Sequence, residues 1–212
     1  MTASRIRALV FLLVGAVICA ASPSDLLAIE VVTVEEHWEL RLGEPDANLS
    51  APQVTMAMSP TSDLSGRHYV FTLNHRTYPQ YSPGGMQVQR WDGENAVDSH
   101  SGSSTSPLWH TGEVVAWVQR LHLDNGQLTF EVADGQSESW GSFGGDDLRL
   151  HVASDLPNLN DYRPGISIEE SGVGYAGNRV HSLTLSRLIW TDADGETYEL
   201  TAPIDVDTDL DP

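Results

Sequence analysis

The chain has 212 residues, of which 11 are Lys or Arg and 30 are Asp or Glu, so its formal charge is −19. All eleven cations are arginines. A polyanion of this kind repels phosphate backbones, which argues against nucleic acid as a partner. Hydrophobic residues make up 40% of the chain and six tryptophans are present. This composition is typical of a folded domain rather than of a disordered segment.

The first 21 residues have the three parts of a secretory signal peptide. Arg5 and Arg7 precede an uncharged apolar stretch over 8–20, and small residues follow it. The stretch is shorter than the roughly 20 apolar residues that cross a bilayer. We therefore expect cleavage near Ser22 rather than a membrane anchor, and a secreted mature protein that makes no further contact with the membrane. A lipid anchor on Cys19 is disfavoured because Ile18 stands where a small residue is needed.

The mature chain is expected to form a single domain over 30–203, followed by a flexible acidic tail over 204–212. Cleavage of the leader removes the single Cys, so disulfides and thiolate chemistry are not available to the mature protein. Its stability must then come from a hydrophobic core, which a chain of this length is able to build.

Alternation of apolar and polar residues dominates the chain after the leader and predicts β-strands with one buried face. Within these strands, the residues expected in the core are Tyr69, Phe71, Leu73, Leu128, Phe130, Val132, Leu148 and Leu150. Asn125-Gly126 and Asp194-Gly195 each stand between two such strands and predict hairpins with type I′ turns. A change of phase between Leu185 and Leu188 predicts a β-bulge near Ser186-Arg187.

Six segments lack a regular pattern and are expected to be long loops: 43–52, 75–85, 92–112, 134–146, 154–165 and 171–178. No stretch keeps the 3.6-residue period of a long helix outside the leader. Many short strands joined by hairpins and loops predict an all-β, antiparallel β-sandwich. A jelly roll of the lectin and glucanase kind is favoured over a closed barrel. It is also favoured over an immunoglobulin-like sandwich, which has fewer strands and a Cys pair.

One predicted strand carries side chains suited to a sugar, because Gln87, Gln89 and Trp91 share the face that points away from the core. An indole face stacks on the apolar side of a sugar ring, and amides both donate and accept hydrogen bonds. Tyr78 and Trp140 lie in neighbouring loops and are expected to extend this surface. The alternative is a wetted polar face on which Trp91 only covers the edge of a sheet.

Calcium is the cofactor that the sequence leaves open. Asp92/Glu94, Asp146-Asp147 and Asp192/Asp194 offer hard oxygen ligands beside glycines. Asp192–Gly195 lacks the acid that closes an EF-hand loop and is more typical of a hairpin. His122 and His151 occupy polar positions of their strands and are expected on the surface rather than as metal ligands.

A glycosidase needs two carboxyl groups facing each other across the scissile bond. Glu35-Glu36 and Glu169-Glu170 are adjacent in sequence, so within a strand the members of each pair would point to opposite faces. We therefore expect a non-catalytic module that binds neutral glycan, since the strong negative charge opposes anionic polysaccharides. The alternatives are a structural or protein-interaction domain of an envelope or extracellular matrix, with an extracellular protein as partner, and a glycan-active hydrolase or lyase of the same fold.

Overall fold

The structure is a computed structural model that describes residues 29–44, 52–74, 85–103, 108, 110–201 and 203–206. The expected leader lies outside these ranges. No helix within them is long and apolar enough to cross a membrane.

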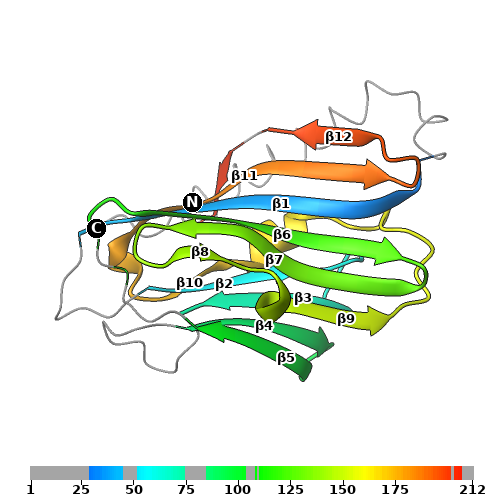
Figure 1. Cartoon of the computed structure of the whole chain (residues 1–212), viewed down its shortest axis with the longest axis horizontal. Helices are drawn as coiled ribbons and strands as arrows, with labels where there is room; N and C mark the ends of the chain where they lie inside the picture. The colour runs from blue at the N-terminus through cyan, green and yellow to red at the C-terminus, as the bar shows by residue number, and fades with distance from the viewer. Residues whose placement is uncertain are drawn as a thin grey trace, which may run out of the picture.

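Two antiparallel sheets pack face to face, which confirms the predicted β-sandwich (Figure 1). The strands of the large sheet are β1 (Val31–Leu42), β6 (Val114–Asp124), β7 (Gln127–Ser137), β8 (Gly141–Phe143), β9 (Arg149–Ala153), β11 (Val180–Asp192), β12 (Thr197–Leu200) and β13 (Ile204–Asp205). The strands of the small sheet are β2 (Gln53–Met58), β3 (Arg67–Leu73), β4 (Gly85–Asp92), β5 (Asn95–Ser103) and β10 (Gly172–Tyr175). The helical elements are α3 (Pro164–Glu170) and the 3₁₀ turns η1 (Asp146–Leu148) and η2 (Gly177–Arg179).

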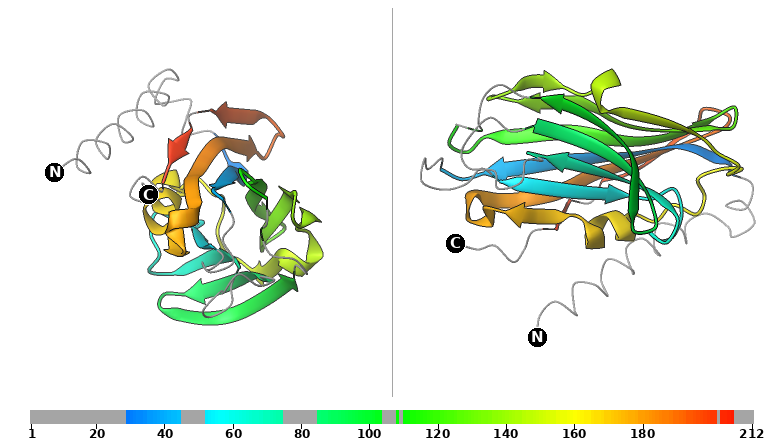
Figure 2. Two further views of the ribbon diagram at one scale, coloured as in Figure 1. Left: turned by 90° about the vertical axis from the view of Figure 1, so that its left-hand side faces the viewer. Right: turned by 90° about the horizontal axis from the view of Figure 1, so that it is seen from below.

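The order of the strands decides which side chains become neighbours. In the described residues the large sheet has the order β12-β11-β1-β6-β7-β8, with β13 beside β11 and β9 beside β7. The small sheet has the order β10-β2-β3-β4-β5. Seen along the sandwich in Figure 2, α3 lies at one side, where Ser171 at its end bonds to Ala57 of β2.

The core lies between the two sheets and contains all eight residues expected there, each at most 1% exposed. Aromatic rings from the two sheets meet in it. Tyr69 of β3 stacks on Phe130 of β7 with ring centroids 4.9 Å apart, and Phe71 meets Trp117 of β6 edge to face at 5.8 Å. The alternation seen in the sequence therefore decides which face of each strand is buried.

The first predicted hairpin is confirmed in detail, because Asn125 and Gly126 both have positive φ angles, 49° and 73°, between β6 and β7. The second hairpin joins β11 and β12 as expected, but its predicted type I′ turn is wrong. Only Gly195 has positive φ, 85°, and the amide of Asp192 donates to the carbonyl of Glu196 at 3.0 Å, which closes a three-residue loop. The Asp192 carboxylate favours this loop by accepting from the amides of Asp194 and Glu196.

Several segments expected as loops contain strands. β5 occupies most of the first half of 92–112, β7 continues to Ser137 and is followed by β8, and β10 lies within 171–178. The sequence did not predict β5 because it is an exposed edge strand, with Val97 45% exposed. Its residues therefore show no alternation of apolar and polar side chains. Leu148 is in the core as expected but belongs to η1 rather than to a strand.

Two further expectations concern 180–212. The predicted bulge is present, since Trp38 pairs with Leu185 and His37 with Arg187, which leaves Ser186 as the extra residue. Ile204 and Asp205, in the segment expected as a tail, form β13 against β11. Residues 207–212 lie outside the described ranges.

Candidate functional site

The outer face of the small sheet holds three of the residues that the sequence singles out. Gln87, Gln89 and Trp91 are half-buried on the side of β4 away from the core, whereas Met86 and Val88 between them are buried. The Gln87 amide donates to the hydroxyl of Ser101 on β5 at 3.4 Å. These residues thus form one line of two amides and an indole along the strand.

Trp91 lies against a histidine on the neighbouring strand. His68 of β3 pairs with Trp91 across the sheet, and the two rings are 6.2 Å apart between centroids and inclined by 17°. His68 is only 6% exposed although it points outward, because Trp91 lies beside it and its Nδ1 bonds to the carbonyl oxygen of Gly66 at 3.1 Å. The nearly parallel arrangement directs one face of the indole toward His68 and the other face away from it.

The other two residues of the expected surface do not add to this line in the structure. Trp140 lies in the turn between β7 and β8 of the large sheet, where it packs edge-on against Phe143 with centroids 6.3 Å apart. Tyr78 lies outside the described residues. The structure therefore brings together Gln87, Gln89 and Trp91 and places Trp140 on a different sheet.

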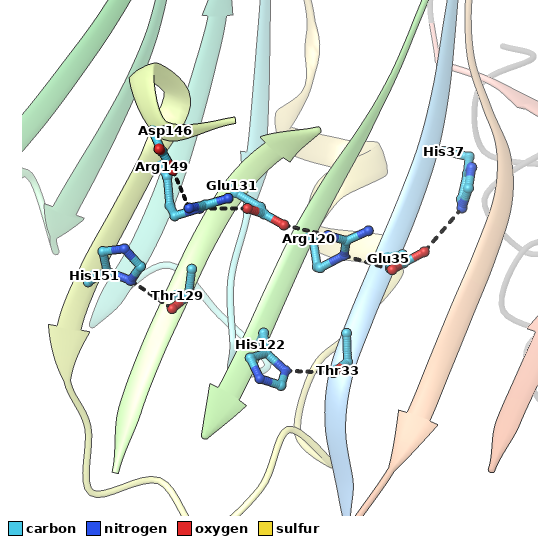
Figure 3. A network of polar contacts seen from close by, with 10 residues as sticks. All are labelled: Thr33, Glu35, His37, Arg120, His122, Thr129, Glu131, Asp146, Arg149 and His151. Carbon is cyan, nitrogen blue, oxygen red and sulfur yellow. Dashed lines mark hydrogen bonds and ion pairs between the residues drawn. The ribbon is translucent and has the colours of Figure 1, made fainter. Parts of the chain in front are cut away.

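The outer face of the large sheet carries two straight rows of polar side chains across four neighbouring strands, β1, β6, β7 and β9 (Figure 3). The charged row consists of Glu35, Arg120, Glu131 and Arg149, which are direct cross-strand partners. The His–Thr row, two residues farther along the strands, consists of Thr33, His122, Thr129 and His151. These residues come from distant parts of the sequence. They are aligned by the order of the strands and by their register.

Ion pairs link the whole charged row. Arg120 donates from Nε to Glu35 at 2.7 Å and from Nη1 to Glu131. Arg149 donates from Nε to the second oxygen of Glu131 at 2.7 Å and from Nη1 to Asp146 of η1. Each arginine thereby bridges two acids, and the side chains are held in one arrangement.

The acids of this row are stabilised as carboxylates. A hydrogen bond with His37 and the guanidinium of Arg120 lower the pKa of Glu35 from 4.5 to about 2. Burial acts to raise the pKa of Glu131, whose side chain is 10% exposed, but hydrogen bonds from Arg149 and Arg120 outweigh burial and lower it. The row therefore combines two carboxylates with two guanidinium groups, and their charges cancel.

The His–Thr row is held by two matching hydrogen bonds. Nδ1 of His122 bonds to the hydroxyl of Thr33 at 2.8 Å, and Nδ1 of His151 bonds to the hydroxyl of Thr129 at 2.9 Å. Both histidines are exposed, as the sequence predicts. Each ring is thus fixed through one nitrogen, while its Nε2 bonds to no described residue.

A fully buried acid, Glu36, lies on the opposite side of β1. Its carboxylate accepts hydrogen bonds from Tyr162 at 2.7 Å, from Trp38 at 2.9 Å and from Ser167 of α3. Burial raises its pKa from 4.5 to about 7, against the lowering effect of these hydrogen bonds. A raised pKa is typical of a general acid, but Glu36 is 0% exposed and no second carboxyl group contacts it among the described residues. Glu36 is therefore closed to solvent in the observed fold.

Two of the six acids considered for calcium, Asp146 and Asp192, have protein partners. Asp146 pairs with Arg149, and Asp192 accepts from Tyr198 at 3.1 Å as well as from the hairpin amides. Within the ranges that the structure describes, no three His, Cys, Asp or Glu side chains are grouped so that they could hold a metal ion.

Comparison with known proteins gives no family for this chain. No protein-family model and no curated protein matches it. Among solved structures, a similarity is found to the CBM40 of the Ruminococcus gnavus IT-sialidase bound to α2,6 sialyllactose, with 15% sequence identity and a TM-score of 0.26. The match covers 72% of this chain and 66%, just under two thirds, of that chain. A likeness this weak carries no argument about fold or ligand.

Proposed function

We propose that the protein is a secreted, non-catalytic module that binds neutral glycan on the outer face of β4. The observation that carries this proposal is the position of Trp91, whose ring lies nearly parallel to His68 with its other face directed away, in line with Gln87 and Gln89. An aromatic platform followed by amide donors and acceptors matches a sugar ring, which has an apolar face and a rim of hydroxyl groups.

Charge and the leader add to the proposal. A chain with a formal charge of −19 repels acidic polysaccharides, so neutral sugars suit it better. The signal-peptide pattern of residues 1–21 would place the module outside the cytoplasm, where such glycans are found. The raised pKa of Glu36 does not favour a hydrolase, because this acid is enclosed in the core.

A glycan array tests this function directly. The mature protein, beginning at Ser22, would be applied to immobilised neutral and acidic glycans, with calcium in one set of arrays and a chelator in the other. We expect binding to neutral glycans that Trp91→Ala weakens and that does not depend on calcium. Binding confined to acidic glycans would contradict the proposal, and no binding to any glycan would favour a structural or protein-interaction domain.

A further inference from the structure

The two rows on the large sheet contain the same set of four side chains twice. Thr33-Val34-Glu35 on β1 recurs as Thr129-Phe130-Glu131 on β7, and Arg120-Leu121-His122 on β6 recurs as Arg149-Leu150-His151 on β9. The first set is Thr33, Glu35, Arg120 and His122, and the second set is Thr129, Glu131, Arg149 and His151. Register gives both sets the same internal pairing, Thr with His and Glu with Arg.

The hydrogen bonds repeat as well as the residues. In both sets the histidine Nδ1 bonds to the threonine hydroxyl, at 2.8 Å and 2.9 Å, and the arginine Nε donates to the glutamate at 2.7 Å. Figure 3 shows the two copies side by side on one face. The face therefore presents one chemical pattern twice, displaced by two strands.

We propose that this face is a second binding surface, distinct from the β4 face, for a linear β-1,4-linked neutral polysaccharide. Neighbouring strands lie about 4.8 Å apart, so the pattern repeats about every 9.6 Å across the sheet. In an extended β-1,4-linked chain each sugar ring is turned over relative to the one before it. Its repeat is therefore a disaccharide, which has about this length.

Peptide ligands fit the period or the chemistry less well. An extended peptide repeats about every 6.6 Å, which does not match the spacing of the sets. A polyproline helix repeats about every 9.3 Å, but prolines offer carbonyl acceptors and no backbone donors. The face has donors and acceptors together, which is the requirement for binding hydroxyl groups.

The donors that remain are at the solvent side of the charged row. Nη2 of Arg120 and of Arg149 bonds to no described residue, while Nε and Nη1 hold the acids, and the two side chains are 28% and 32% exposed. Each Glu–Arg pair is neutral overall, so the two sets hold no unbalanced charge that would favour a charged ligand. The ion pairs fix these side chains before binding. Binding of a ligand therefore costs the protein little additional side-chain entropy there.

Calorimetry with β-1,4-linked glucose and N-acetylglucosamine oligosaccharides tests this surface. The tetrasaccharide spans both sets and is expected to bind about tenfold or more tightly than the disaccharide. His122→Ala and His151→Ala should each reduce tetrasaccharide affinity to that of the disaccharide, while disaccharide binding persists at the intact set. The double variant should bind neither. His181→Ala, an exposed histidine on β11 outside both sets, is the matched control and should behave as wild type.

The variants also separate this surface from the β4 face. Trp91→Ala should leave the gain in affinity from disaccharide to tetrasaccharide unchanged. If Trp91→Ala abolishes this gain in affinity and the double histidine variant keeps it, the sugar binds at β4 and this inference is overturned. Failure of both oligosaccharide series to bind would overturn it too, whatever the array shows for other glycans. Binding of a polyproline peptide in their place would identify a proline-rich partner. Melting temperatures of all variants show whether a loss of binding is a loss of fold.

Discussion

The phenol of Tyr162 donates a 2.7 Å hydrogen bond to the carboxyl of Glu36, and both side chains are buried. Ser167 of α3 donates to the same oxygen. One acid on β1 therefore anchors both the loop before α3 and the helix itself to the large sheet. Gln119 of β6 adds a further contact to this acid, since its Nε2 donates to Glu36 Oε2 at 3.5 Å.

The free energy of unfolding is expected to fall as pH rises from about 5 to 8. The folded protein raises the pKa of Glu36 from 4.5 to about 7, so it holds this proton more tightly than the unfolded chain does. The resulting stabilisation is complete below pH 4.5 and is lost as pH rises through 7, at a cost of about 3 kcal/mol. Urea denaturation at several pH values measures it.

Glu36→Gln is the control, because an amide accepts from Tyr162 and Ser167 and cannot ionise. Its unfolding free energy should stay level between pH 5 and 8. Glu35, the preceding residue, has the opposite dependence: its pKa of about 2 gives stabilisation that is present above pH 4.5 and is lost as pH falls through 2. A wild type that gains stability between pH 5 and 8 would contradict the assignment to Glu36.

Removal of Arg120 should destabilise the fold although the residue lies on the outer face. Arg120→Ala leaves Glu35 and Glu131 without their shared donor, and Glu131 is only 10% exposed. We expect a loss of about 1.5–3 kcal/mol, the range for hydrogen bonds to charged groups. Arg41→Ala breaks an exposed pair with Glu39 and should cost less than about 1 kcal/mol. Equal losses in the two variants, measured by chemical denaturation, would mean that the charged row does not stabilise the sheet.

Trp91→Ala should weaken glycan binding by about 1–2 kcal/mol, a factor of about 5–30, since the stacking surface is lost. The melting temperature should fall little, because the indole is half-buried rather than enclosed. The alternative result is a stability loss of about 3–5 kcal/mol, as for buried tryptophans, with no glycan bound by the wild type. It would show that Trp91 only covers the edge of the sheet.

Export should remove the leader. N-terminal sequencing of protein recovered outside the cytoplasm is expected to begin near Ser22, because small residues end the apolar stretch there. An intact Met1 on that material would contradict cleavage.

The sequence predicts strands best where one face is buried. Alternation identified β3 and β7, because each places three large apolar side chains in the core. β5 was missed because its residues are polar or exposed on both faces, so its sequence lacks the two-residue alternation of apolar and polar side chains. The three-residue loop after Asp192 was missed for another reason: the carboxylate that holds it is outside the Asp-Gly pair.

The candidate sites divide in the same way. Gln87, Gln89 and Trp91 could be predicted to share a face because they belong to one strand. The two rows could not, because β1 meets β6 and β7 meets β9 only through the topology of the sheet. The recurring Thr-x-Glu and Arg-Leu-His triplets are visible in the sequence, but only the register shows that they line up.

The central place of β1 in the large sheet has a consequence for the order of folding. Trp38 pairs with Trp117 on one side and with Leu185 on the other, so the strand made first needs partners made much later. Sheets dominated by such distant pairings fold slowly, because long loops must close before the contacts form. During synthesis β1 would have β6 on one side well before β11 emerges on the other, so its second edge stays open until residues 180–192 have been made.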